Sequence, residues 1–372
     1  MTTDFATYCS RLDEFLRRAS SLSPSEQDPA FASLALDLFR LQYENVPIFR
    51  RLCDARGINP ATVQRLVDIP CVPTTAFKEF DLTSLPPLER TRVFHSSGTT
   101  GHRPSRHFHG GDSLAIYEHS LLGPFRRHVL DGLREPVILL CLTPSPALAP
   151  HSSLVHMFET IGRQTGAGIA FLGRIESDGG WGLDLPAAHA AFTAAVSRGQ
   201  PVVVLGTAFS FVQLIDHPAP GETSLRLPAG SRVMETGGYK GRTRELPKAE
   251  LHRLITRQLG VPASHIVCEY GMSELSSQAY DRVAGHPLAD GGRVFHFPPW
   301  ARAVVVSPET GEEVRDGETG LIRAFDLANV RSVMAIQTED LGVRRGDGFE
   351  LLGRAPAAEP RGCSLMSTGG RP

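Results

Sequence analysis

One stretch indicates how this chain folds and what it holds: Phe94-His95-Ser96-Ser97-Gly98-Thr99-Thr100-Gly101. It begins at the end of the short apolar run 92–94, so we expect a strand that opens into a loop. Glycine lets a backbone close around an anion with several N–H groups exposed, and the hydroxyls add uncharged donors. Such a loop often holds the phosphates of a nucleotide. A flexible surface loop is the alternative, and the Walker spacing G-x-x-x-x-G-K-[ST] is absent.

Strand and helix patterns alternate after this stretch. Short apolar runs bounded by Gly, Pro or polar residues predict buried strands at 137–142, 168–172, 201–205, 232–234 and 265–268. Helical spacing of apolar residues predicts helices at 114–129, 153–165, 186–197, 209–215 and 247–259. This alternation predicts an α/β fold whose ligand lies beyond the carboxyl ends of the strands.

The two ends of the chain have different patterns. Apolar residues at helical spacing predict a largely helical segment 1–90, in which Ser25 and Asp28 are candidate caps and Pro29 suits a first helical position. Beyond about residue 284, runs at 303–306, 320–324 and 332–336 alternate with turn clusters and predict a small antiparallel β unit. We therefore expect a helical segment 1–90, an α/β core 91–283, a small β-rich subdomain 284–354 and a mobile tail 355–372.

Composition narrows the class of protein. The 372 residues suffice for roughly two to three domains, and a net charge of −2 with a pI near 6.7 gives no reason to expect a nucleic acid or a membrane surface as partner. No secretory signal and no apolar run long enough for a membrane span are visible. The six cysteines are scattered without a C-x-x-C pair, which argues against disulfides and a structural zinc site and predicts a cytoplasmic protein.

Three later motifs carry possible chemistry. Glu269-Tyr270-Gly271-Met272-Ser273-Glu274 follows a predicted strand, so a tyrosine ring could lie against a purine and a carboxylate could hold Mg²⁺. Gln337-Thr338-Glu339-Asp340-Leu341-Gly342 is expected to be a turn whose Asp340 accepts hydrogen bonds from a ribose. Leu352-Gly353-Arg354 offers a cation. Taken singly, each is more often a set of ordinary loop or surface residues.

Together and in this order, the motifs resemble the adenylate-forming superfamily, which includes acyl-CoA synthetases, firefly luciferase and non-ribosomal adenylation domains. The resemblance spans about residues 72–363 and is closest to the acyl-protein synthetase (LuxE) family, with the phenylacetate–CoA ligase type more distant. The features that carry it are Val72-Pro73-Thr74-Thr75-Ala76-Phe77-Lys78, Ser152-Ser153-Leu154-Val155-His156-Met157, Thr236-Gly237-Gly238-Tyr239-Lys240-Gly241, and the ending Gly353-Arg354 with Arg361-Gly362-Cys363-Ser364.

The resemblance implies an adenylate-forming large-domain fold with a helical N-terminal segment, layered α/β sheets and a small antiparallel β unit, without the full mobile C-terminal domain. It implies that ATP is held by Ser96, Ser97, Gly98, Thr99, Thr100, Gly101, Gly237, Gly238, Tyr270, Gly271, Met272, Ser273, Asp340 and Arg354, and Mg²⁺ by Glu274. Ser96 to Gly101 would cradle the β- and γ-phosphates, Gly237 and Gly238 would line the adenine slot, and Tyr270 would stack on the base. Asp340 would bind the ribose, and Arg354 the ribose or a phosphate.

Two departures from the superfamily pattern bear on this. Glu339 replaces the usual glycine before Asp340, and the C-terminal catalytic lysine of larger members has no counterpart. In proteins of the LuxE type the acyl group passes to a cysteine near the C-terminus, and Cys363 lies in the matching position.

The function implied is ATP-dependent conversion of a carboxylic, for example fatty, acid to acyl-AMP, followed by transfer to Cys363 as a thioester. An acyl reductase, an acyltransferase or a carrier protein would then collect the acyl group. A ligase that passes the acyl group to coenzyme A or a carrier protein, and a nucleotide-binding scaffold without turnover, are the alternatives. Whether the acid is fatty or aromatic, and the oligomeric state, are left open by the sequence.

Overall fold

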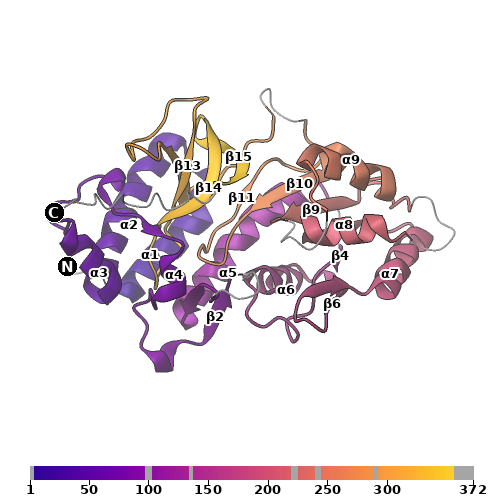
Figure 1. The fold of residues 1–372 in the computed structure, drawn as a ribbon, viewed down its shortest axis with the longest axis horizontal. Helices are drawn as coiled ribbons and strands as arrows, with labels where there is room; N and C mark the ends of the chain where they lie inside the picture. The colour runs from indigo at the N-terminus through magenta and orange to yellow at the C-terminus, as the bar shows by residue number, and fades with distance from the viewer. Residues whose placement is uncertain are drawn as a thin grey trace, which may run out of the picture.

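The fold is built around a six-stranded sheet in the computed structural model, which describes residues 4–96, 103–133, 137–218, 225–238, 244–287 and 292–355 (Figure 1). The strand order is β11-β10-β9-β8-β4-β5. The strands are β4 (Ile138–Cys141), β5 (Gly168–Phe171), β8 (Val202–Thr207), β9 (Arg232–Thr236), β10 (Ile266–Tyr270) and β11 (Ala279–Tyr280). All neighbours are parallel except β11, which pairs antiparallel with β10. The five strands predicted for the core are therefore confirmed, and β11 was not predicted.

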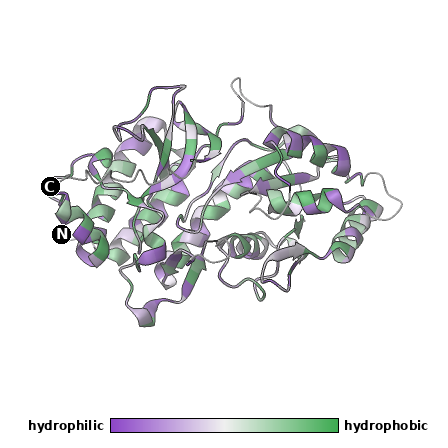
Figure 2. Ribbon diagram, in the orientation of Figure 1, coloured by the Kyte–Doolittle hydropathy of each residue, from purple (hydrophilic) through white to green (hydrophobic). Residues whose placement is uncertain are grey.

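Helices cover both faces of this sheet. One face carries α5 (Gly111–Phe125) and α6 (Ser153–Thr165), and the other carries α7 (Leu185–Arg198), α8 (Ala208–Asp216) and α9 (Lys248–Leu259). Successive strand residues serve opposite faces, so Val203 packs in the core of α5 and α6 while Val202 and Val204 pack in that of α7 to α9. This two-sided burial explains why the strands are continuously apolar. The helices alternate between hydrophobic and hydrophilic residues, as expected for helices with one face on a sheet (Figure 2).

A second sheet lies between the parallel sheet and the N-terminal helices (Figure 1). Its strands are β12 (Ala301–Val306), β13 (Thr319–Asp326), β14 (Ala335–Arg345) and β15 (Gly348–Arg354), which pair antiparallel, and β1 (Val72–Pro73), which pairs parallel with β14. The predicted antiparallel unit is present, but two details were wrong. Residues 332–334 precede the strand, and the expected turn at 337–342 lies inside β14, an eleven-residue strand whose pairing shifts at Leu341/Gly342.

The N-terminal segment is helical as expected. Its helices are α1 (Phe5–Arg18), α2 (Pro24–Asn45), α3 (Pro47–Ala55) and the short α4 (Ala76–Glu79). The predicted start of α2 was wrong, because Ser23 and Glu26 form a capping box around Pro24 and the helix begins there. Pro29 therefore lies inside the helix. It has no N–H to donate to the carbonyl of Ser25, but Ser25 is exposed, so water can bond that carbonyl instead.

These helices share one hydrophobic core with the second sheet. Phe31, Leu38 and Phe39 of α2 belong to the same buried cluster as Phe325 and Ile336. The division of the chain at residues 90, 283 and 354 stays a prediction. Two hairpins complete the fold: β2 (Arg92–His95) with β3 (Arg106–His109), and β6 (Gly173–Ile175) with β7 (Trp181–Leu183). None of the helices in the described ranges combines the length and the hydropathy that crossing a bilayer demands.

Gln42 of α2 ties the helices to the second sheet. Its amide is fully buried, donates to the carbonyl of Asn329 (2.8 Å) and accepts from the N–H of Met334 (3.0 Å). We expect Gln42→Leu to lower the free energy of unfolding by about 2–4 kcal/mol, because both backbone groups lose their partner while buried. Gln164→Leu, at an exposed position of α6, should stay within about 0.5 kcal/mol. Urea unfolding of the two variants checks this, and equal midpoints would contradict it.

Candidate functional site

Three of the sequence motifs meet where the two sheets face each other. Tyr270, the last residue of β10, donates a hydrogen bond from its hydroxyl to Oδ2 of Asp340 on β14 (2.8 Å). Arg354 is the register partner of Asp340 on β15, and its Nε lies 3.9 Å from Oδ1 of that carboxylate. Burial raises the pKa of Asp340, while the Tyr270 hydroxyl and the charge of Arg354 lower it. Tyr270, Asp340 and Arg354 are thus one connected group.

The phosphate-loop motif joins the same region through its described end. Ser96 follows β2, and its Oγ accepts a hydrogen bond from the N–H of Ser105 (2.9 Å). Oγ of Ser105 lies 3.3 Å from Oγ of Ser273, which donates to Oε2 of Glu274 (2.9 Å). A chain of contacts through Ser96, Ser105 and Ser273 therefore runs from the loop motif to the acidic residue expected to hold Mg²⁺. Ser97, Gly98, Thr99, Thr100 and Gly101 lie outside the described residues.

His107 secures this junction. Burial lowers its pKa to about 4, so the ring is neutral at pH 7. Its Nδ1 lies 2.9 Å from the carbonyl oxygen of Ser273, and a carbonyl only accepts, so Nδ1 carries the proton. The hairpin β2–β3 and the loop after β10 are therefore fixed to each other.

Glu269 joins the two glycine-containing loops, a role that the sequence motif did not indicate. It is the register partner of Thr236 in β9, and the Thr236 hydroxyl donates to its Oε2. Gly237 follows Thr236 with a φ of 66°, a conformation that favours glycine. On the other side, a Cβ on Gly271 would lie 2.3 Å from Oε1 of Glu269, so a side chain there would displace the Glu269 carboxyl group from its present position. The signal in the sequence was a charged residue inside an apolar strand.

Asp326 and Asn329 hold the loop that carries Ser273 and Glu274, and sequence reasoning also missed them. The fully buried Asp326 accepts from the N–H of Ser276 (2.8 Å) and from the hydroxyl of Ser277 (2.7 Å). The Asn329 amide donates to the carbonyl of Glu274 (2.9 Å). Burial raises the pKa of Asp326 to about 6, although these donors lower it. The β13–β14 connection therefore positions the loop after β10.

The residues present suit a nucleotide with its magnesium ion. Chain neighbours apart, no described residue comes within 4 Å of the position that a Cβ would take on Gly237 or Gly238. That is the space a planar base needs beside a backbone wall. Glu274 offers a carboxylate next to a hydroxyl, oxygen donors of the kind that Mg²⁺ takes. The ring of Tyr270 packs edge-on against Phe349, 5.1 Å between centroids.

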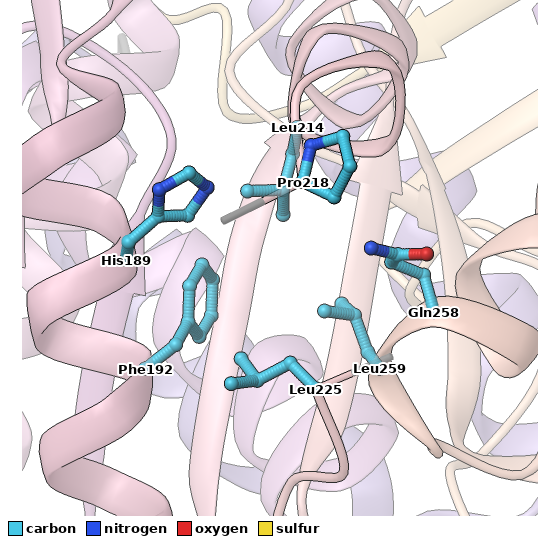
Figure 3. A pocket seen from close by; sticks show the side chains of 7 residues that line it. All are labelled: His189, Phe192, Leu214, Pro218, Leu225, Gln258 and Leu259. Atoms are coloured by element: carbon cyan, nitrogen blue, oxygen red, sulfur yellow. The ribbon is translucent and has the colours of Figure 1, made fainter. Parts of the chain in front are cut away.

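The remaining predicted residues differ in exposure. Met272 is half-buried, Glu274 is buried, and the Arg354 side chain is 81% exposed. Cys363 lies outside the described residues. A separate hollow of about 20 Å³, which holds about one water molecule, is enclosed by α7, α8 and α9 (Figure 3). None of the predicted site residues lines it, and the residues that do are His189, Phe192, Leu214, Pro218, Leu225, Gln258 and Leu259.

Comparisons with known proteins agree with this geometry. The family model described as "Acyl-protein synthetase, LuxE" matches residues 182–368. The long-chain-fatty-acid–luciferin-component ligase of Vibrio harveyi is 22% identical over 363 residues, which cover 94% of this chain and 90% of the relative. The phenylacetate-coenzyme A ligase of Thermus thermophilus is 42% identical over 65 residues, or 16% of this chain and 15% of that protein.

Solved structures show the same fold. A crystal structure of 2-hydroxyisobutyryl-CoA ligase, in complex with 2-HIB-AMP and CoA, superposes with a TM-score of 0.69 at 15% identity. The match covers 90% of this chain and 69% of that one. The expected adenylate-forming large-domain fold is therefore confirmed.

Glu269 makes a testable contribution to the pH dependence of stability. Burial raises its pKa to about 7 from the ordinary 4.5, so the folded state keeps a proton that the unfolded chain releases between these values. The stability that Glu269 contributes is full below about pH 4.5 and is lost as the pH rises through 7. Glu269→Gln should therefore unfold at higher urea than the parent protein at pH 8, by a few kcal/mol at most, with the gap closing toward pH 5.

The matched control is Glu250→Gln on α9, where the side chain is 42% exposed, and it should give parallel curves. Urea midpoints between pH 5 and pH 8 measure both variants. A gap for Glu269→Gln that widened toward pH 5 would contradict the assignment.

Proposed function

Because this chain belongs to the LuxE family of acyl-protein synthetases and is an AMP-forming acid ligase, we propose that it joins a fatty acid to its own Cys363 as a thioester. ATP and the acid first react to give acyl-AMP and pyrophosphate. The observation that carries the proposal is the convergence of Tyr270, Asp340 and Arg354 with the chain of serine contacts that runs from Ser96 to Glu274. The name of the Vibrio harveyi relative, a long-chain-fatty-acid ligase, supports a fatty acid as the substrate.

Each part of ATP has a proposed partner. Residues 96–101 hold the β- and γ-phosphates, and Arg354 contacts the ribose or a phosphate. The backbone of Gly237 and Gly238 lines the adenine slot, and the loop from Tyr270 through Ser273 closes its other side. Asp340 accepts from the ribose hydroxyls through Oδ1, since the Tyr270 hydroxyl is bonded to Oδ2. Glu274 holds Mg²⁺, which neutralises phosphate charge when bound.

The first step needs positioning more than covalent help from the protein. A carboxylate oxygen of the acid attacks the α-phosphorus, a P–O bond forms, and the bond to pyrophosphate breaks. Holding the acid and ATP in line removes the entropic cost of their encounter. Hydroxyl and backbone donors fixed by the network around Ser273 stabilise the charge that develops on the phosphates.

The second step transfers the acyl group. The Cys363 thiolate attacks the carbonyl carbon of acyl-AMP, a C–S bond forms, and AMP leaves with the electrons of the C–O bond. Arg361, two residues earlier, favours the thiolate. An acyl reductase or an acyltransferase then takes the acyl group. The similarity to phenylacetate-coenzyme A ligases supports coenzyme A as the alternative acceptor.

Asp340 tests the nucleotide site. We expect acid-dependent ATP–pyrophosphate exchange, with the KM for ATP raised about tenfold to a hundredfold in Asp340→Ala, because hydrogen bonds to a charged group contribute about 1.5–3 kcal/mol. Asp347→Ala is the matched control, since this aspartate is 92% exposed at the β14–β15 turn of the same hairpin. Exchange with an unchanged KM in Asp340→Ala would argue against the ribose role, and no exchange with any acid would refute the first step.

Cys363 tests the acceptor. Intact-mass measurement after incubation with ATP and a fatty acid should show one acyl adduct, removable by hydroxylamine, on the parent protein and none on Cys363→Ser. Cys71→Ser, which changes a thiol in the β1 region, is the control and should still be acylated. If Cys363→Ser released acyl-CoA at the parental rate when coenzyme A is added, the external acceptor would replace the proposal.

A further inference from the structure

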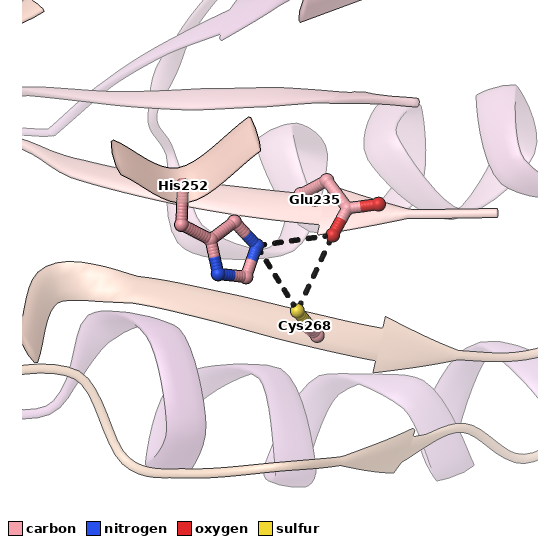
Figure 4. A group of neighbouring side chains, drawn as sticks. All are labelled: Glu235, His252 and Cys268. Atoms are coloured by element: carbon pink, nitrogen blue, oxygen red, sulfur yellow. Dashed lines mark hydrogen bonds and ion pairs between the residues drawn. The ribbon is translucent and has the colours of Figure 1, made fainter. Parts of the chain in front are cut away.

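A buried group of three chemically different side chains lies beneath the loops of the candidate site. Glu235 comes from β9, His252 from α9 and Cys268 from β10 (Figure 4). Glu235 and Cys268 are fully buried, and His252 is 5% exposed. The three side chains point at one another, with Oε2 of Glu235, Nε2 of His252 and Sγ of Cys268 at the meeting point. None of them has a role in the proposed reaction.

We propose that Glu235, His252 and Cys268 form a structural zinc site. The three ligand atoms stand 3.4 Å (Oε2 to Nε2), 3.5 Å (Sγ to Nε2) and 3.3 Å (Sγ to Oε2) apart. Tetrahedral zinc with bonds of about 2.3 Å to sulfur and about 2.0–2.1 Å to nitrogen or oxygen sets its ligands about 3.3–3.6 Å apart. The triangle therefore already has the dimensions of one face of such a site.

The donor types agree with this metal. Thiolate, imidazole and carboxylate are the three side-chain donors that zinc takes. Without a metal, the thiol and the imidazole can donate at most two hydrogen bonds among the three ligand atoms. A bound cation would instead form a bond to each of the three atoms. The other carboxylate oxygen, Oε1 of Glu235, is buried without a hydrogen-bond partner among the described residues, so hydrogen bonding within the protein does not fully satisfy this carboxylate.

Two cations from neighbouring elements face the group. Nζ of Lys248 lies 2.9 Å from Oε2 of Glu235 and 3.7 Å from Sγ of Cys268, and its side chain is 39% exposed. It supplies positive charge while no metal is bound, and it can turn into solvent when zinc enters. Nη1 of Arg293 lies 3.6 Å from the same sulfur but is ion-paired to Asp281 and stays in place. Zinc therefore competes with Lys248, and a water molecule on the Lys248 side completes the coordination.

The sequence pattern pointed away from zinc because it shows no closely spaced pair of ligands. The three residues come from three separate elements, and the parallel pairing of β9 with β10 brings Glu235 and Cys268 together as register partners. A metal here would bond both strands and α9. These strands lead directly to Gly237 and Tyr270, so the site would stabilise the base of the nucleotide loops.

Zinc titration of the full chain tests the proposal. The protein carries Cys363→Ser, so that the tail thiol does not bind metal, and is stripped with chelator before Zn²⁺ is added in competition with a chromophoric chelator. We expect one equivalent to bind, and Cys268→Ser to weaken binding at least about a hundredfold. Cys141→Ser, a buried thiol of β4 outside the group, should bind like the parent. Substitution with Co²⁺ should give a thiolate-to-metal charge-transfer band that Cys268→Ser lacks.

Lys248→Met is a second test, because it should strengthen zinc binding, whereas a misfolded variant would weaken it. Removing the competing ammonium should tighten Zn²⁺ binding about tenfold, and Zn²⁺ should raise the midpoint of thermal unfolding by more in this variant than in the parent. The proposal is overturned if the parent binds Zn²⁺ no more tightly than Cys268→Ser does. Unchanged or weaker binding in Lys248→Met would also overturn it.

Discussion

The buried carboxyl group of Asp326 connects the two sheets of this molecule. It stands at the end of β13 and accepts hydrogen bonds from Ser276 and Ser277, in the loop that follows β10. A carboxylate without water must have its oxygens bonded, so this loop cannot leave the second sheet without a large desolvation cost. Ser273 and Glu274 belong to the same loop, so the contacts of Asp326 also fix the positions of these two residues. The candidate site therefore depends on a contact made behind it.

The parallel sheet supplies the other constraint. Because β9 and β10 run side by side in the same direction, the loops that follow Thr236 and Tyr270 begin at adjacent points of one edge. Glu269 lies between them, and its carboxyl group meets the Thr236 hydroxyl on one side and the backbone of Gly271 on the other. A side chain at position 271 would push this carboxyl group out of its position. Preorganisation of this kind fixes the points at which the two loops begin before any ligand binds.

The core of the fold was predictable because its signals are local. Strands such as β4 and β8 are buried on both faces, and their apolar runs and flanking breakers are visible in the sequence. The interior of β14 was not predictable, since Thr338, Glu339 and Asp340 have the composition of a turn. In the structure they lie where the pairing with β13 shifts between Leu321 and Arg323, and Asp340 pairs with Arg354 of β15. The predicted start of α2 was also wrong. Both Pro24 and Pro29 suit the first position of a helix, and the helix begins at Pro24 because Ser23 and Glu26 form a capping box there.

The motifs named residues that the structure brings together, but the residues that support the candidate site had no such signature in the sequence. Tyr270, Asp340 and Arg354 were identified by their order along the chain, and the structure brings them together. Asp326, Asn329 and Glu269 each act through contacts with residues distant in sequence or across a strand pair. A charged residue in a mainly apolar strand was the available sign for Glu269 and Asp326. Tertiary pairing determines such positions, and one sequence alone does not reveal it.

The pairing of β1 with β14 has a consequence for how the chain folds during synthesis. Val72 and Pro73 can pair only after Ile336 and Gln337, near the other end of the sequence, have been synthesised. The apolar face of α2 is likewise covered only when residues around Phe325 have emerged from the ribosome. Contacts of such high sequence separation slow folding and leave hydrophobic surface exposed in the nascent chain. The N-terminal helices therefore leave the ribosome with apolar surface that only later residues cover, and the half of the candidate site that includes Asp340 forms last.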